Sequence, residues 1–100
     1  KYRKGEHAVR TGDSFRDVGF VVRGLFRIYS VDRKGTERIK AFRAERDFVA
    51  PYAEILRGEP ARSDIEALEE SEVVWVSFDI LDGLAKKSIY WSSVLREQAE

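Results

Sequence analysis

The feature that most constrains the fold is a series of short strand-like segments, separated by turn signals, that fills the first three quarters of the chain. The expected strands cover residues 6–10, 17–23, 25–31, 36–44, 61–68 and 73–78. Short strands at such regular spacing, followed by a helical pattern, are typical of a small β-sandwich or jelly roll. We therefore predict a mainly β fold, a double-stranded β-helix or jelly roll, with one short helix inside it and further helices at the C-terminal end.

The most regular local signal is a hairpin centred on the turn Asp32-Arg33-Lys34-Gly35. Gly35 can adopt the positive φ that such turns require. Before the turn, the side chains of one strand alternate between two faces, with Phe26, Ile28 and Ser30 on one face and Leu25, Arg27, Tyr29 and Val31 on the other. Gly24 separates this strand from the preceding one, which predicts a sharp bend or a close backbone approach.

The stretch DFVAPYAEILRGEP combines both prolines of the chain with one short helical pattern. Pro51 suits the first helical position, where its missing N–H costs little, and Gly58 suits the position just past the helix end. Between them, Tyr52, Ile55 and Leu56 are expected to pack inward. The start of this helix is either one side of an anion site, which Pro51 weakens by removing a donor, or part of a packing helix across the mouth of the roll.

The apolar pattern changes its period near the C-terminal end. Residues 73–78 are apolar on both faces and are expected to form a buried strand. Asp79 is a candidate N-cap for a helix over residues 80–87, whose apolar stripe consists of Ile80, Leu81 and Leu84. Residues 88–100 continue the helical spacing with Tyr90, Trp91, Val94 and Leu95. This apolar face suits a dimer seam or packing on the same domain, and its size favours the seam.

Composition and single residues argue against an enzyme or a metal protein. Eighteen basic and eighteen acidic residues balance, so the chain has no electrostatic reason to bind nucleic acid in bulk. It has no cysteine and a single histidine, His7, which is expected at the surface or at the rim of a sheet. Four acids around a turn are expected to form a solvated edge rather than a catalytic pair: Glu66, Glu69, Glu70 and Glu72. We expect no catalytic residue, no metal site and no cofactor, and no apolar run is long enough to cross a membrane.

The order of these signals resembles the cyclic-nucleotide-binding domain of the Crp/Fnr family of bacterial transcription regulators. The resemblance covers essentially the whole chain and is most specific in VVRGLFRIY, in the DRKG hairpin and in IEALEESEVVWV. It implies a β-roll effector domain over residues 1–78 and C-terminal helices over residues 79–100, the last of which begins a dimerisation helix. It also implies a homodimer, a cytoplasmic location and DNA binding through a helix-turn-helix domain that this chain lacks. Because the chain starts at Lys1 and stops within a helical pattern, we expect it to be part of a longer protein.

The phosphate-binding cassette of that family is altered in this chain. Cyclic-nucleotide binders of the family carry Gly-Glu where this chain has Ala50-Pro51, and they carry an arginine where it has Ala61. Arg62 follows by one residue, and alternation along the strand points it away from the face of Ser63. The resemblance therefore implies a roll that does not bind cyclic AMP. The pocket either binds an unknown small-molecule effector or is filled by Tyr52 or Phe48. Its expected wall consists of Ala50, Pro51, Tyr52, Arg62 and Ser63.

These residues leave three functions open. A sensory and dimerisation domain of a Crp/Fnr-type transcription regulator is favoured. The alternative is a cyclic-nucleotide-binding regulatory module of a non-transcription protein, such as a kinase subunit or a channel, which the Ala50-Pro51 departure weakens. A jelly-roll enzyme would need a bound metal, for which one histidine supplies too few ligands.

Overall fold

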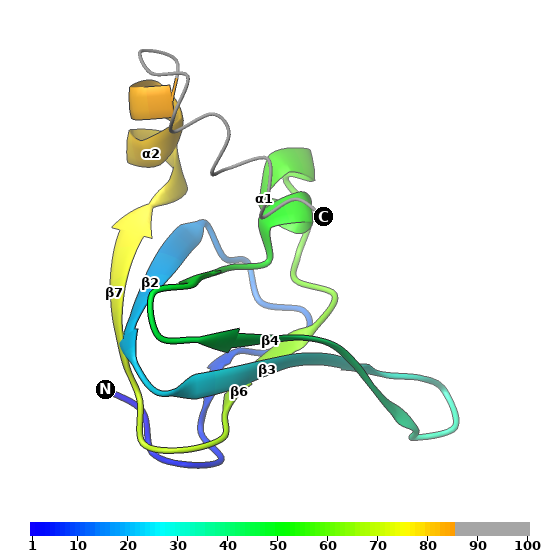
Figure 1. Cartoon of the computed structure of the whole chain (residues 1–100). Coiled ribbons are helices and arrows are strands. Elements are labelled where there is room, and N and C mark those ends of the chain that lie inside the picture. The colour runs from blue at the N-terminus through cyan, green and yellow to red at the C-terminus, as the bar shows by residue number, and fades with distance from the viewer. Residues whose placement is uncertain (86–100) are drawn as a thin grey trace.

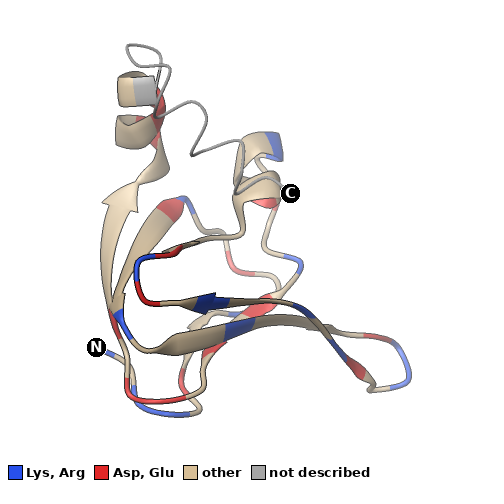
Figure 2. Ribbon diagram, viewed as in Figure 1, with Lys and Arg blue, Asp and Glu red and all other residues tan. Residues whose placement is uncertain are grey.

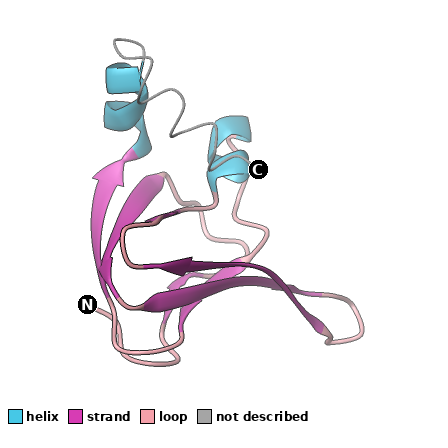
Figure 3. Ribbon diagram, viewed as in Figure 1, coloured by secondary structure: helices cyan, strands magenta, loops and turns pink. Residues whose placement is uncertain are grey.

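Two antiparallel sheets face each other in the computed structural model, which describes residues 1–85 (Figure 1). The larger sheet has the strand order β1 (His7–Val9), β6 (Asp64–Ala67), β3 (Leu25–Val31) and β4 (Glu37–Ala44). The smaller sheet has the order β5 (Phe48–Val49), β2 (Asp17–Arg23) and β7 (Glu72–Ser77). Helices α1 (Tyr52–Arg57) and α2 (Phe78–Ala85) lie together at one end of the sheets (Figure 3). The predicted mainly β jelly roll is confirmed.

The main core lies between the two sheets and draws on both. Phe26 of β3 and Val21 of β2 are both 0% exposed, and Ile65 of β6 is 1% exposed. Burying an apolar side chain of this size contributes roughly 1.5–3 kcal/mol. The alternation predicted for β3 and for the strand around Ile65 therefore matches the observed core, with Val9 of β1 closing one side.

A second, smaller cluster anchors the helices to the end of the roll. Tyr52 and Ile55 of α1 are three residues apart, share a helix face and are buried against Phe78. Leu56, which was expected to pack inward, is 54% exposed, because one helical step of about 100° carries it off that face. The prediction for Gly58 is confirmed, since this residue ends α1 with a φ of 67°.

The hairpin between β3 and β4 forms as predicted. The Asp32 side chain accepts hydrogen bonds from the backbone N–H of Lys34 at 2.8 Å and of Thr36 at 3.0 Å, and Gly35 has a φ of 83°. The two strands extend beyond the body of the roll (Figure 1). Local turn chemistry is therefore sufficient to set the position of this hairpin.

One irregularity in the hairpin matters for the site. Ile28 of β3 pairs with Ala41 of β4, but the next residue, Tyr29, pairs with Ile39. Lys40 is therefore an extra residue on β4 with no pairing partner on β3. One extra residue of this kind on one strand of a pair is a β-bulge. A bulge changes the direction of the side chains beside it.

The bend predicted at Gly24 coincides with a close approach to the turn before β7. Gly24 has a φ of 111°, and a Cβ atom at this position would overlap the side chain of Ser71. Ser71 is 1% exposed, and its hydroxyl bonds the backbone N–H of Leu25 and the carbonyl of Glu69. Only glycine fits this crossing without displacing Ser71.

The strand after that turn is less buried than predicted. β7 pairs with β2 on one side, and within the described part of the chain it has no strand on the other. Val73 and Trp75 pack against the core, whereas Val74, on the opposite face, is 51% exposed, although the apolar run predicted a strand buried on both faces. An apolar run signals a strand here but does not establish that both of its faces are covered.

The starts of the two helices also shift, by one residue for α1 and by two for α2. Pro51 precedes α1 instead of opening it, and α2 begins at Phe78, so Asp79 lies in its first turn instead of at the N-cap. On α2, Leu81 is buried, but the other two residues of the predicted stripe are largely exposed: Ile80 and Leu84. The predicted dimer seam over residues 88–100 lies outside the described residues.

Candidate functional site

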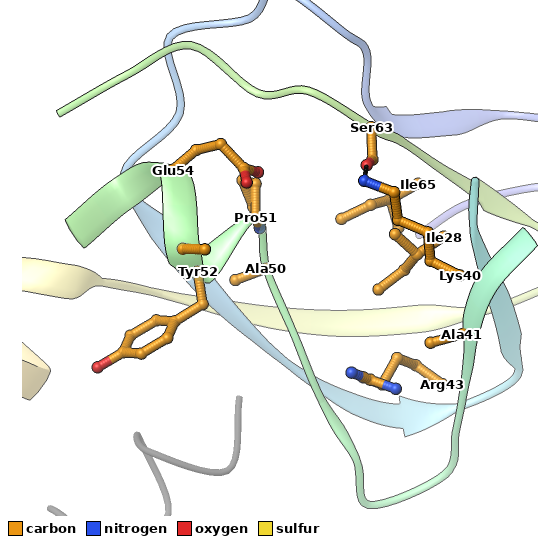
Figure 4. A pocket seen from close by; sticks show the side chains of 11 residues that line it. Ile28, Lys40, Ala41, Arg43, Ala50, Pro51, Tyr52, Glu54, Ser63 and Ile65 are labelled. Atoms are coloured by element: carbon orange, nitrogen blue, oxygen red, sulfur yellow. Dashed lines mark hydrogen bonds between the residues drawn. The ribbon is translucent and has the colours of Figure 1, made fainter. Parts of the chain in front are cut away.

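A cavity of about 190 Å³ lies between β4, the segment that leads into α1, and the start of β6 (Figure 4). Its lining comes from segments far apart in the sequence. The lining residues are Ile28, Lys40, Ala41, Arg43, Ala50, Pro51, Tyr52, Ala53, Glu54, Ser63 and Ile65. Apolar side chains of the core form its floor, and polar groups are placed around it, which is the usual composition of a ligand pocket.

One wall is the chain that enters α1. Pro51 is buried and has no N–H, so the chain offers one donor fewer to the cavity at this point. The ring of Tyr52 points away from Lys40 and Ser63 (Figure 4) and packs on Phe78, with ring centroids 5.6 Å apart. Burial raises the pKa of the Tyr52 hydroxyl, with a further contribution from Asp82. The Tyr52 ring therefore does not fill the cavity.

The opposite wall carries two cations from β4. The bulge brings Lys40 to the same side of the strand as Ala41 and Arg43, and basic positions recur along this strand (Figure 2). The Lys40 ammonium donates a hydrogen bond of 2.7 Å to the hydroxyl of Ser63, which is 6% exposed. Within residues 1–85, no carboxylate lies within ion-pair distance of Lys40 or Arg43.

The cavity contains one acid, Glu54 of α1. Its carboxylate lies 3.9 Å from the guanidinium of Arg57 on the same helix. The negative charge of Glu54 is therefore partly balanced by Arg57, which does not line the cavity, while no carboxylate within residues 1–85 balances the charges of Lys40 and Arg43 in this way. The lining has a net positive charge.

Four of the five predicted pocket residues line this cavity: Ala50, Pro51, Tyr52 and Ser63. Arg62 does not line it. Arg62 is exposed, and its guanidinium lies 3.1 Å from the carboxylate of Glu59. These residues precede β6, which begins at Asp64 and not at residue 61 as predicted, but the predicted sides are observed, since Ala61 and Ser63 are buried while Arg62 is exposed.

The sequence reasoning missed the cations of the cavity, Lys40 and Arg43. Their spacing of three residues places them on opposite faces of a regular strand. Only the bulge brings both to the cavity, and nothing in the sequence around Lys40 marks it. Phe48, the other residue expected to fill the pocket, does not line the cavity. Its ring packs on Phe20, with ring centroids 5.6 Å apart.

A second polar cluster lies on the opposite face of the larger sheet. The Nε2 atom of His7 and the hydroxyl of Tyr29 are 2.7 Å apart, and Nε2 lies 3.7 Å from the carboxylate of Asp64. The side chain of His7 is only 12% exposed, and β1 is the edge strand of the larger sheet, so this histidine lies at the rim of a sheet, one of its two expected places, and not on the open surface. Pairing of β1 with β6 buries it, with His7 opposite Glu66.

Two pKa shifts follow from this cluster. Burial raises the pKa of the Tyr29 hydroxyl, and the nearby Asp64 adds to the rise. For Asp64, burial alone would raise the pKa, but hydrogen bonds from Thr11 and Tyr29, together with His7, outweigh it and leave the pKa lowered. The hydroxyl and the backbone N–H of Thr11 both donate to the Asp64 carboxylate at 2.7 Å.

Arg27 also lies on this face of the larger sheet, beside Tyr29. Its guanidinium lies 3.9 Å from the centre of the Tyr29 ring and donates to Glu66 at 2.6 Å and to Glu37 at 3.0 Å. Hydrogen bonds to Glu37 and Glu66 raise the pKa of Arg27. Glu66 was expected at a solvated edge, but β6 lies between β1 and β3 and Glu66 is paired there, so that expectation is wrong.

Among residues 1–85, no three His, Cys, Asp or Glu side chains are grouped so that they could hold a metal ion. No helix within those residues has the length and apolar character needed to cross a membrane.

The fold is thus that of a β-roll domain, a jelly roll in which the short helix α1 lies between β5 and β6 and borders a cavity. The chain belongs to the cyclic nucleotide-binding domain family, whose model matches residues 1–88. The resemblance seen in the sequence is thereby confirmed at the level of the family.

Its relatives are regulators of the Crp/Fnr type. The chain is 32% identical over 85 residues to the fumarate and nitrate reduction regulatory protein of Vibrio cholerae, a match that covers 85% of this chain and 33% of the relative. The structure of FixK2 from Bradyrhizobium japonicum is 26% identical with a TM-score of 0.78, over 97% of this chain and 47% of that one. The sensor domain of the transcriptional regulator DNR from Pseudomonas aeruginosa is 18% identical with a TM-score of 0.83, and the match covers 97% of this chain and 65% of that one. The chain thus spans about a third of the length of its curated relative.

Proposed function

We propose that the chain is the sensory domain of a Crp/Fnr-type transcription regulator and that its cavity binds a small effector other than cyclic AMP. One observation carries the second part of this proposal. Ala61, at the position where the resemblance places the phosphate-binding arginine, is 3% exposed in the core, and the neighbouring Arg62 faces outward and pairs with Glu59. The cavity persists while the residue that would hold a cyclic phosphate is absent from it.

The energetic consequence is large enough to decide between ligands. The resemblance assigns cyclic-nucleotide binding to a glutamate and an arginine, which this chain replaces by Pro51 and Ala61. Each lost charge-assisted hydrogen bond is worth roughly 1.5–3 kcal/mol. Losing two of them weakens binding by about a hundredfold or more.

Calorimetric titration with cyclic AMP and cyclic GMP tests this part of the proposal. We expect no heat of binding at micromolar nucleotide, for the chain as it is and for Arg62→Gln. Micromolar binding that is lost in Arg62→Gln would show that Arg62 turns inward to hold the phosphate. That result would favour a cyclic-nucleotide-binding regulatory module of another kind of protein.

We further propose that the complete protein is a cytoplasmic homodimer that binds DNA through a domain outside this chain. The family resemblance and the apolar spacing of residues 88–100 support this proposal. Sedimentation of a protein extended past Glu100 tests it, with Trp91→Glu as the variant and the exposed Lys34→Glu as the matched control. We expect a dimer that Trp91→Glu dissociates and Lys34→Glu does not, and a monomer at tens of micromolar would contradict the proposal.

A further inference from the structure

The charge of the cavity narrows the chemistry of its ligand. Lys40 and Arg43 contribute two cations, and no carboxylate of the described residues lies within ion-pair distance of either. The acid of the lining, Glu54, lies near Arg57. A cavity with an unbalanced positive charge favours an anionic ligand, since the oxygen atoms of an anion accept charge-assisted hydrogen bonds from the cations.

The hydroxyl of Ser63 supports the same conclusion. It accepts a hydrogen bond from the Lys40 ammonium, and its residue is 6% exposed. In residues 1–85, no acceptor is found for the proton of this hydroxyl. A buried hydroxyl that can still donate is available to an oxygen atom of a ligand in the cavity.

The volume of the cavity limits the size of that ligand. About 190 Å³ is below the range of roughly 300–1,000 Å³ that is usual for drug-sized ligands. A compound with one or two charged groups and a short carbon chain fits this space.

We propose that the effector is a small oxyanion, a carboxylate or a phosphate, whose charged group is bound by Lys40 and Ser63, while Arg43, at the other end of the cavity, adds to its positive charge (Figure 4). This inference rests on the proposed effector role of the cavity and gives that effector its chemical class. The binding group comes from the bulged strand β4 instead of the segment that leads into α1. Ala50 and Pro51 then form an apolar wall beside the ligand and contribute no charge.

Amide chemical shifts of the chain in solution test the proposal. The probes are succinate, inorganic phosphate and neutral succinamide, all at matched ionic strength, with cyclic AMP in a parallel titration. We expect millimolar succinate or phosphate to shift the amide signals of Ala41, Ala50 and Ser63. Comparison of the two affinities shows whether the cavity prefers a carboxylate or a phosphate. Succinamide is expected to leave these amides unchanged.

Variants with equal change of charge locate the binding group. Lys40→Gln is expected to weaken anion binding about tenfold or more, the effect of one lost charge-assisted hydrogen bond, and Arg43→Gln is expected to weaken it less. Lys34→Gln, in the exposed hairpin turn, is the matched control and is expected to leave the affinity unchanged. Equal weakening in all three variants would reveal general charge attraction and overturn the inference.

The remaining outcomes separate this inference from the proposed function. If neither anion shifts the cavity amides, or if succinamide shifts them equally, the small-anion inference is wrong and the sensory role of the cavity is unaffected. If cyclic AMP binds far more tightly than either anion, the proposed function is wrong in its exclusion of cyclic nucleotides. The response of that binding to Lys40→Gln would then show whether β4 still supplies the charge.

Discussion

Replacement of Gly24 by alanine is expected to destabilise the roll more than its single added methyl group suggests. Gly24 has a φ of 111°, so any side chain there is strained by roughly 1–2 kcal/mol. The new Cβ also overlaps Ser71, whose hydroxyl bonds the backbone at Leu25 and Glu69. Forced repacking of a filled site costs roughly 1–3 kcal/mol, and the strained hydrogen bonds add about 1 kcal/mol. The free energy of unfolding should therefore fall by about 3–6 kcal/mol.

Gly12 provides a matched control for this prediction. Its φ is 96°, and a Cβ atom there would meet nothing within 4 Å. Gly12→Ala therefore carries the backbone strain without the overlap and should cost only about 1–2 kcal/mol. Urea denaturation of both variants measures the difference. If Gly24→Ala were no less stable than Gly12→Ala, the overlap with Ser71 would not be what makes glycine necessary at position 24.

Three further predictions concern the remaining contacts. Tyr29→Phe removes the hydroxyl beside His7 and should lower the free energy of unfolding by about 1–3 kcal/mol, because it leaves a buried ring nitrogen without a partner; an unchanged urea midpoint would contradict this. The lowered pKa of Asp64 means that its stabilisation is present above the ordinary value of 3.8 and is lost as the pH falls through the lower folded value. Asp64→Asn should accordingly reduce the loss of stability between neutral and acidic pH, and equal losses in both proteins would refute the assignment. Ile55→Ala should cost about 2–4 kcal/mol and Leu56→Ala almost nothing in thermal melts, and a reversed order would mean that α1 packs with a different face.

Much of the fold follows from local sequence signals. The boundaries expected for residues 17–23 and 25–31 coincide with β2 and β3, and the hairpin turn forms with Asp32 in its predicted place. These signals depend on residues close together in the chain, such as a glycine in a turn or a β-rich run between polar residues. Such information is present in any short stretch of the sequence.

The errors arise where partners come from distant parts of the chain. The side chain of His7 is largely covered because β1 pairs with β6, more than fifty residues later, and the pattern around His7 gives no sign of that partner. Val74 is exposed because its side of β7 faces away from the core on which Val73 and Trp75 pack. Burial of a strand depends on its neighbours, and the sequence of the strand alone does not specify them.

The candidate site was predicted in part for the same reason. Ala50, Pro51 and Ser63 were found from the family resemblance, which preserves the position of the segment that leads into α1. Lys40 and Arg43 were missed because they reach the cavity through a bulge in β4. A bulge is a property of how two strands pair, so it becomes visible only with the register of both.

The extra residue in β4 has a consequence for how such domains diversify. Insertion or deletion of one residue on this strand exchanges the side chains that point into the cavity, while Phe26 and Ile65 on the neighbouring strands keep their places in the core. The chemistry accepted by the cavity is thus separable from the packing that holds the roll together. Natural variants that differ in length at β4 are therefore the place to seek changed ligand preference on an unchanged scaffold.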